Sequence, residues 1–433
     1  MGSHYFYNCR PDQRFTLSRR TPMASEIMWH VEDWDQRRSL QVRSPKRKNP
    51  DKDKEEHLFL FEALAKVIDD LPVDALLAQF LDDGTLLSAS SDITEDIAYV
   101  PFYPSRTDFP LDTPTVRRRD LIEVDRLGLM VDLTTYQPSP GKTKTVVFKY
   151  FIYEGNRATW WYEANCVMRI PKHDNIVSFD AVVLDMVDGD NKVVGFTTQY
   201  VPGGTLETNK DRVFKLKYLE QLTEVIDYLN LSLGIVHGDI CPWNLLINPE
   251  TDNIQIFDFN LAAKLGWEGD EANNWVFEHD KHCDDVKFVV FTLYEIITRE
   301  LSFRREISPE ELDASRVMRK RTWKKHPDVL LDKPVTKYRQ VLAEWVGRRK
   351  TIDKEIDHFT KASEPLDLPP VPGFPAEDVA GRPLERAAQN RFELVNLGLD
   401  FLKWQRPPTR DLPLPKGRRL LATGEVVADD DGP

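Results

Sequence analysis

The sequence has few cysteines and no long hydrophobic run. Its four cysteines (Cys9, Cys166, Cys241 and Cys283) are far apart, and none forms a C-x-x-C pair, which argues against a disulfide framework and favours a reducing compartment. No stretch of about 18 apolar residues occurs, so no membrane-spanning helix is predicted. The first residues also lack the apolar core of a signal peptide. We therefore expect an intracellular protein, cytoplasmic or nuclear, with no membrane partner.

An excess of positive charge is also missing. The 58 Lys and Arg residues are outnumbered by 71 Asp and Glu residues, which gives a formal net charge of -13, so we expect no nucleic-acid partner. Hydrophobic residues make up 41% and charged residues 30% of the 433 residues, a balance typical of globular proteins. The length allows one large domain or two to three ordinary ones.

Residues 1–115 are predicted to form an N-terminal extension. Up to about residue 55 the sequence is polar and interrupted by prolines, and residues 43–56 carry the mixed charge of a solvated linker. Residues 56–82 repeat apolar positions at three- and four-residue spacing, which predicts a helix broken near Pro72.

Residues 116–199 read as a half-domain rich in strands. Short β-branched runs predict strands at 121–128, 129–136, 143–151, 175–187 and 192–201, with a helix at 157–170. Residues 200–410 are mainly helical in pattern and contain an insertion at 301–390, and residues 411–433 are expected to be a disordered tail. A strand-rich half followed by a helical half predicts an α+β fold with two lobes.

The most informative stretch is residues 234–260. Asp239 and Asn244 lie five positions apart in a predicted loop, and Asp258 follows a short predicted strand. Transfer of a phosphoryl group requires an oriented acceptor hydroxyl and neutralisation of the phosphate charge. Asp239 is suited to accept the hydroxyl proton, and Asn244 and Asp258 offer the hard oxygen ligands that magnesium prefers.

These motifs resemble those of the protein-kinase superfamily. HGDICPWN (237–244) stands where the family has H-R-D-x-x-x-x-N, DFN (258–260) where it has D-F-G, and VVFK (146–149) where it has V-A-I-K. The resemblance implies a bilobal kinase-like fold with an antiparallel sheet and one helix in the N-lobe and a mainly helical C-lobe. It also implies ATP and Mg²⁺ bound between the lobes.

The resemblance assigns roles to further residues. Lys149 is expected on the α- and β-phosphates, with Glu163 as its ion-pair partner. The other implied nucleotide contacts are Gln199 and Val201 in the hinge, Leu246 under the adenine, and Gly128 in the phosphate loop. Residues 285–300 resemble the central helix of the C-lobe, and RPPTR (406–410) resembles its closing arginine motif.

The sequence departs from the family at several positions. Gly128 is the single glycine where the family has three, and Gly238 replaces the arginine of H-R-D. Cys241 stands where serine/threonine kinases carry a lysine, and Asn260 replaces the glycine of D-F-G. Residues 261–284 contain no Ser, Thr or Tyr, so phosphorylation there is not the switch.

Three functions therefore stay open. An active protein kinase would transfer phosphate to a protein hydroxyl, which is the function that we favour. A small-molecule kinase resembling the aminoglycoside and choline phosphotransferases would use an acceptor pocket built from residues 301–390. A pseudokinase would serve as a binding or scaffold protein. The acceptor is in each case unidentified.

Residues 278–285 allow two interpretations, a zinc site or an ordinary loop that leads into a helix. His279, His282 and Cys283 lie close together there among carboxylates, but zinc requires a fourth ligand in suitable geometry. We favour ordinary loop and helix-start residues.

Overall fold

The computed structural model describes residues 5–46, 53–96, 98–187, 189–269, 277–377, 381–384 and 388–429. The chain divides into two compact units. The first consists of residues 1–157, 180–198 and 372–433, and the second of residues 158–179 and 199–371.

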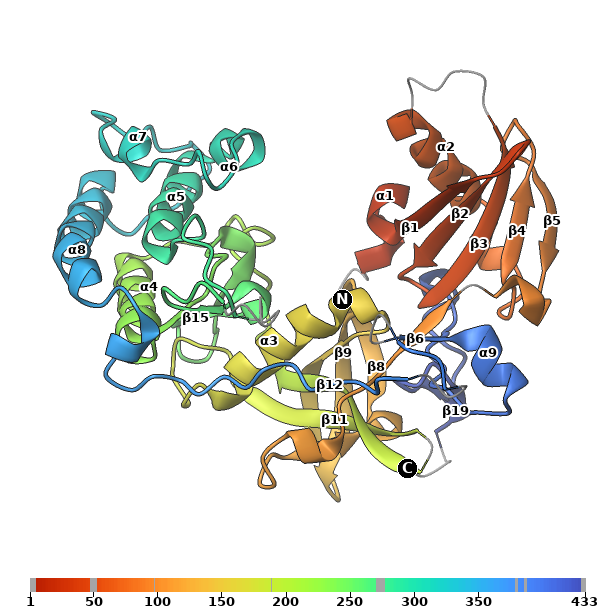
Figure 1. Cartoon of the computed structure of the whole chain (residues 1–433). Coiled ribbons are helices and arrows are strands. Elements are labelled where there is room, and N and C mark those ends of the chain that lie inside the picture. Colours follow the sequence, from red (N-terminus) through yellow and green to blue (C-terminus); the bar gives the residue numbers. More distant parts are fainter. Residues whose placement is uncertain are drawn as a thin grey trace. The chain divides into compact units, whose positions relative to one another are not determined.

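A five-stranded sheet opens the first unit, with its strands in chain order (Figure 1). The strands are β1 (Phe15–Pro22), β2 (Glu26–Asp33), β3 (Arg38–Pro45), β4 (Leu77–Phe80) and β5 (Leu86–Ser90). Alternate residues of β2 (Ile27, Trp29 and Val31) are buried in one core with Leu64 of helix α2 (Asp53–Ala65). The period of two along β2 therefore sets which face of the sheet is covered.

This sheet corrects the interpretation of the N-terminal extension. The predicted helix at 56–82 is wrong beyond Ala65, because Leu77–Phe80 forms β4 and pairs in parallel with β3. Residues 15–45, for which no strand was predicted, form three strands, and the last of them includes the start of the predicted linker at 43–56. For Leu77–Phe80 the pairing with the separate strand β3 decided the structure, and helical spacing alone does not report such pairing. Strands β1, β2 and β3 pair as consecutive antiparallel neighbours. Residues 47–52 of the predicted linker lie outside the described residues.

A six-stranded sheet forms the rest of the framework of the first unit, in the order β7-β11-β12-β10-β9-β8. Its strands are β7 (Thr115–Arg117), β8 (Ile122–Gly128), β9 (Val131–Ser139), β10 (Lys142–Tyr150), β11 (Phe179–Val187) and β12 (Asp190–Gln199). The strands predicted between residues 121 and 201 are thus confirmed. The sheet is mixed rather than antiparallel throughout, because β7 runs parallel to β11.

The second unit is built mainly from helices. They are α3 (Arg157–Arg169), α4 (Leu216–Asp227), α5 (Asp285–Thr298), α6 (Ser302–Glu306), α7 (Ala314–Met318) and α8 (Val335–Glu355). Two short antiparallel pairs join β13 (Ile235–Val236) to β16 (Ala263–Lys264) and β14 (Leu245–Ile247) to β15 (Ile254–Ile256). The helix predicted at 157–170 is confirmed as α3, which from residue 158 onward belongs to this unit.

The C-terminal segment belongs to the first unit from residue 372 onward, so the predicted lobe boundary at 410 is wrong. Strand β17 (Ala388–Asn390) pairs with β6 (Tyr99–Pro101) and leads into α9 (Arg391–Asn396). The predicted disorder of 411–433 is wrong for residues 411–429, which contain the hairpin β18 (Arg418–Leu420) and β19 (Val426–Ala428). Ala422 in its turn is fully buried and donates its N–H to Leu121, and this contact orders the segment.

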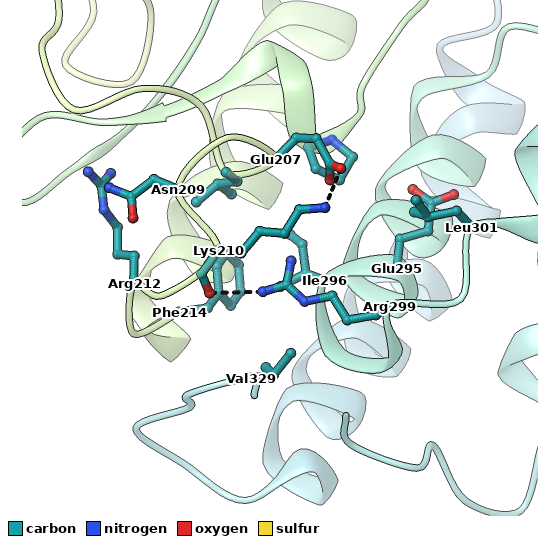
Figure 2. A pocket seen from close by; sticks show the side chains of 12 residues that line it. Glu207, Asn209, Lys210, Arg212, Phe214, Glu295, Ile296, Arg299, Leu301 and Val329 are labelled. Atoms are coloured by element: carbon teal, nitrogen blue, oxygen red, sulfur yellow. Dashed lines mark hydrogen bonds and ion pairs between the residues drawn. The ribbon is translucent and has the colours of Figure 1, made fainter. Parts of the chain in front are cut away.

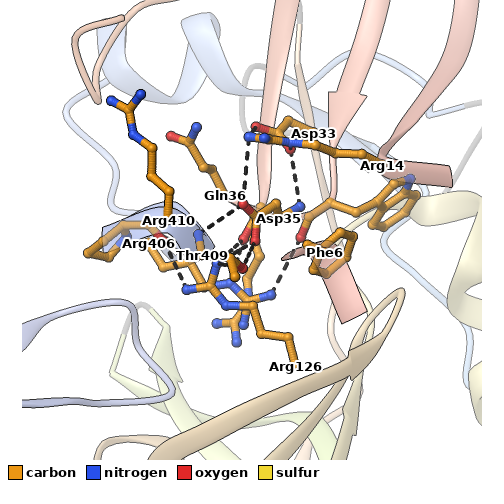
Figure 3. Close-up of polar contacts among 12 residues, drawn as sticks. Phe6, Arg14, Asp33, Asp35, Gln36, Arg126, Arg406, Thr409 and Arg410 are labelled. Carbon is orange, nitrogen blue, oxygen red and sulfur yellow. Dashed lines mark hydrogen bonds and ion pairs between the residues drawn. The ribbon is translucent and has the colours of Figure 1, made fainter. Parts of the chain in front are cut away.

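Buried charges join the two sheets of the first unit to its C-terminal segment (Figure 3). Asp35, just after β2, accepts hydrogen bonds from Arg126 of β8 and from the N–H of Thr409 at 3.0 Å. Arg406 donates to the Asp35 carbonyl at 2.7 Å. Arg406 was expected to close the helical lobe, and that prediction is wrong, because its partners lie in the first unit.

Further contacts complete this buried charge cluster, which consists of Asp35, Arg37, Glu123, Arg126, Asp132 and Arg406. Arg406 donates to Glu123 at 2.8 Å and to Asp132 at 2.9 Å, and all three side chains are at most 1% exposed. Burial alone would raise the pKa of the Glu123 carboxyl, but attraction to Arg406 and two further arginines lowers it to about 2. The carboxylate is therefore charged at neutral pH and depends on these arginines.

None of the helices among the described residues has the length and apolar composition needed to cross a bilayer.

Candidate functional site

The loop after β13 carries the first predicted site residues. Gly238 has φ of +81°, and a Cβ atom built there would lie 2.5 Å from the Leu261 carbonyl oxygen. A side chain cannot fit without moving the backbone. The glycine in place of the arginine of H-R-D is thus required by the local conformation of this loop.

Asp285, at the start of α5, binds the backbone of this loop. Its carboxylate accepts hydrogen bonds from the N–H groups of His237 at 2.8 Å and Gly238 at 2.9 Å, and from the Asn230 side chain at 2.9 Å. Asp285 is 2% exposed, so three donors offset the cost of burying its charge. The sequence marked Asp285 as the start of a helix but did not reveal this anchoring contact.

Asp239 and Asn244 are brought together by the 3-10 helix Pro242–Asn244. The Asn244 side-chain N–H₂ donates to the Asp239 carbonyl and to Asp239 Oδ2, both at 2.9 Å. The bond to Oδ2 leaves Asp239 Oδ1 as the carboxylate oxygen available to an incoming hydroxyl. Because the Asn244 nitrogen is committed to Asp239, its Oδ1 is the atom suited to a cation.

Asp258 is tied to the same loop through the backbone. Strand β15 pairs with β14, and the N–H of Phe257 donates to the Asn244 carbonyl at 3.3 Å. His237 Nε2 lies 2.9 Å from the Phe257 carbonyl oxygen. Asp239, Asn244 and Asp258, which the sequence predicted as a group, are therefore held in one region of the second unit.

The backbone at Asp258 is strained. Its φ is +71° and its ψ is +65°, a left-handed conformation that costs energy for a residue other than glycine. Two residues on, Asn260 Oδ1 is buried and accepts no hydrogen bond from the described part of the chain. Strain and an unsatisfied acceptor beside the loop are typical of functional sites rather than of ordinary turns.

The other predicted site residues are divided between the two units. Lys149, on β10, and Gly128, at the end of β8, belong to the first unit, and Lys149 is 9% exposed. Glu163 on α3, Val201 and Leu246 belong to the second, as does the exposed Gln199. Glu163 is 6% and Val201 4% exposed, whereas Leu246 pairs with Thr205 across an isolated bridge.

The sequence did not predict that two large apolar side chains at this loop are exposed. Trp243 is 43% and Leu261 51% exposed, although large apolar side chains are usually buried. Cys241 is fully buried, and its Sγ lies 3.4 Å from the Asp239 carbonyl oxygen. Burial raises the pKa of the Cys241 thiol, and the guanidinium of Arg304 partly opposes this rise.

The alternative zinc site is not supported. His279 Nδ1 accepts the Gly266 N–H at 2.9 Å, and Cys283 lies 3.5 Å from the Asp280 carboxylate. Within the described ranges, no group of three His, Cys, Asp or Glu side chains is arranged to hold a metal ion.

A pocket lined by both charged and apolar side chains lies beside the loop in the second unit (Figure 2). Pro242 contributes to its wall together with Glu207, Lys210, Glu295 and Arg299, and Arg299 Nη2 donates to the Lys210 carbonyl at 2.8 Å. Glu295 is 2% exposed, and its Oε2 has no hydrogen-bond partner among the described residues. Burial raises the pKa of the Glu295 carboxyl to about 7 and Glu207 adds to the rise, while Arg304 and Arg305 oppose it.

We expect Glu295 to make stability depend on pH. Its pKa in the folded protein is above the ordinary value of 4.5, so the folded state binds the proton more tightly than the unfolded state. Stability from this group should therefore fall as pH rises from about 4.5 to about 7, by about 3 kcal/mol. Urea unfolding of the wild type and Glu295→Gln at pH 5 and pH 8 measures the effect. The wild type should lose stability relative to the variant at pH 8, and an unchanged difference would contradict the assignment.

The sequence comparisons agree with this geometry. Residues 141–280 match the family model described as Protein kinase domain. Over 109 residues, the chain is 32% identical to Protein kinase MCK1 of Saccharomyces cerevisiae, and the matched region covers 23% of this chain and 29% of that protein. The matched region thus spans less than a third of this relative. On the family match, the relative and the loop geometry together, this chain contains a protein-kinase-like domain.

Proposed function

We propose that this protein is an ATP- and magnesium-dependent phosphotransferase that transfers the γ-phosphate of ATP to a protein hydroxyl. The observation that carries the proposal is the arrangement of Asp239 and Asn244. The Asn244 amide fixes one carboxylate oxygen of Asp239 and leaves the other to the acceptor. Asp285 holds the backbone of the same loop.

In this proposal Asp239 acts as a general base. The acceptor oxygen forms a bond to the γ-phosphorus while the bond from that phosphorus to the β–γ bridging oxygen breaks, and ADP leaves. The hydroxyl proton passes to Asp239 Oδ1. Catalysis of this reaction rests mainly on positioning and on charge neutralisation, so a carboxylate held by a rigid loop is well suited to it.

The residues present fit a magnesium ion. Asn244 Oδ1 and the Asp258 carboxylate are hard oxygen donors of the kind that magnesium prefers, and we propose that they hold it. Asn260 Oδ1, buried without a hydrogen-bond donor among the described residues, adds an acceptor suited to a metal-bound water. Magnesium, when bound, neutralises negative charge on the phosphate oxygens.

The nucleotide contacts are likewise proposals. We propose Lys149, oriented by Glu163, for the α- and β-phosphates. We propose main-chain contacts at Gln199 and Val201 with the adenine, Leu246 beneath it, and Gly128 near the phosphates.

A second function is favoured by the turn between β8 and β9. Gly128 pairs directly with Val131, so only two residues form the turn, and Met130 has φ of +57°. This tight turn offers few free N–H groups for a phosphate, whereas glycine-rich loops cradle phosphates through such groups. A protein that binds nucleotide without turnover is therefore the alternative.

Thermal unfolding with ATP and magnesium tests the proposal. A ligand that binds only the folded state stabilises it by about 2.7 kcal/mol at 100 times its Kd. We expect a rise in Tm with ATP that requires magnesium and disappears in Asp258→Ala. Asp328→Ala is the control, because its side chain is 82% exposed on a surface turn, and it should keep the full shift. An unchanged wild-type Tm at millimolar ATP would contradict nucleotide binding, and a shift without phosphate transfer would support the alternative.

A further inference from the structure

Arg304, on α6, binds three residues of α5, the helix that also supports the Asp239 loop. Its Nε donates to Glu295 Oε1 at 3.0 Å, and its Nη2 donates to the Phe288 carbonyl at 2.9 Å and to Thr292 Oγ1 at 2.8 Å. The Arg304 side chain is 10% exposed. A short surface helix would not need so deeply buried a cation for stability alone, because desolvating a guanidinium is costly.

Thr292 links Arg304 to the loop. It is fully buried, and its hydroxyl donates to the Ile240 carbonyl at 2.8 Å. A hydroxyl has one proton, so Thr292 can only accept from Arg304 while it donates to Ile240. A cationic donor on the oxygen polarises the hydroxyl and strengthens its bond to Ile240. Ile240 directly follows Asp239.

The loop itself has no basic side chain. Residues 239–244 read DICPWN, so a positive charge must come from another segment. Burial and the Asp239 carboxylate raise the pKa of the Cys241 thiol in this loop, and the Arg304 guanidinium lowers it. Two aromatic contacts keep α6 in place, since the Phe303 ring lies 5.8 Å from Phe291 and 5.9 Å from Tyr294.

We propose that Arg304 is a positioning residue, which holds the backbone next to Asp239 through the Thr292 hydroxyl and so couples α6 to the reaction. The inference rests on the proposed function for its kinetic consequence. Its structural part, the tie between α6 and the loop, stands separately. Residues 301–306 therefore influence the position of the Asp239 backbone, although they contribute no group that touches a substrate.

The kinetic test uses two variants that break the tie at different points. Arg304→Ala removes the donor and Thr292→Val removes the hydroxyl at nearly constant shape. Each should lower kcat about tenfold, because small displacements of a reacting group are costly, with KM for ATP unchanged. The double variant should be no slower than the slower single variant, and Thr292→Ser should restore the rate. Arg305→Ala, at an exposed neighbouring position, should leave kcat unchanged. Additive losses or an equal loss in Arg305→Ala would overturn the inference.

A second measurement does not require activity. Cys241 and Cys166 are both fully buried in the second unit, so their alkylation by iodoacetamide, followed by mass spectrometry, reports opening of the loop and of α3 respectively. Arg304→Ala and Thr292→Val should raise the Cys241 rate at least about fivefold while Cys166 stays unchanged. Unchanged Cys241 labelling, or an equal rise at both cysteines, would overturn the tie. If the wild type transfers no phosphate but Cys241 responds as expected, the proposed function fails and the structural inference stands.

Discussion

Asp239→Asn should lower kcat for phosphate transfer about 100- to 10,000-fold, the range in which a general base contributes. Asparagine retains the size of the side chain and can still accept from Asn244, but its amide cannot take the acceptor proton. The loop should keep its shape, because Asp285 holds the N–H groups of His237 and Gly238 independently. Steady-state kinetics with ATP and a general protein acceptor measure the loss.

A control variant makes the same change from Asp to Asn at a surface position away from the loop. Asp328→Asn makes the same chemical change at a side chain that is 82% exposed, and it should leave kcat within about twofold, because exposed charges contribute little. The magnesium-dependent Tm shift with ATP should persist in Asp239→Asn. A variant that retains wild-type kcat would remove Asp239 from the mechanism.

Arg406→Met should destabilise the first unit by about 3–5 kcal/mol, the cost of removing one partner from a buried ion pair. The substitution replaces the aliphatic volume but leaves the carboxylates of Glu123 and Asp132 with fewer cations. It also removes the donor to the Asp35 carbonyl. Three segments far apart in the chain should loosen together, and the midpoint of urea unfolding, followed by tryptophan fluorescence, should fall.

Arg410→Ala is the matched control in the same segment. Arg410 pairs with Asp70, but these side chains are 45% and 71% exposed, so the loss should be at most about 1 kcal/mol. Equal effects of the two substitutions would mean that the buried charge cluster does not hold the C-terminal segment. Limited proteolysis should cut near residues 411–429 sooner in Arg406→Met than in Arg410→Ala.

The candidate site could be predicted from sequence because its parts are local. Asp239 and Asn244 lie five residues apart within one loop, and Asp258 follows β15, which pairs with β14 directly after Asn244. Strands β8, β9 and β10 also follow from their β-branched runs, since they pair with strands adjacent in the chain. Local spacing is the information that a single sequence carries.

Strand β4 of the N-terminal sheet escaped prediction for the opposite reason. The apolar residues of 56–82 fit a helix by spacing, yet Leu77–Phe80 is a strand because β3 offers it hydrogen-bond partners. Local pattern cannot weigh that competition, since strand preference depends on the neighbours that a segment finds.

By itself the sequence pointed to the residues that we propose as base, magnesium ligands and phosphate-binding lysine, and it shows that residues 239–244 contain no cation. Tertiary structure decided where the supporting charges are. Arg406 meets Asp132 across 274 positions, and Arg304 reaches Ile240 only through Thr292 on another helix. Such contacts depend on how separate elements pack, because burying a charge is tolerated only where the fold provides its partners.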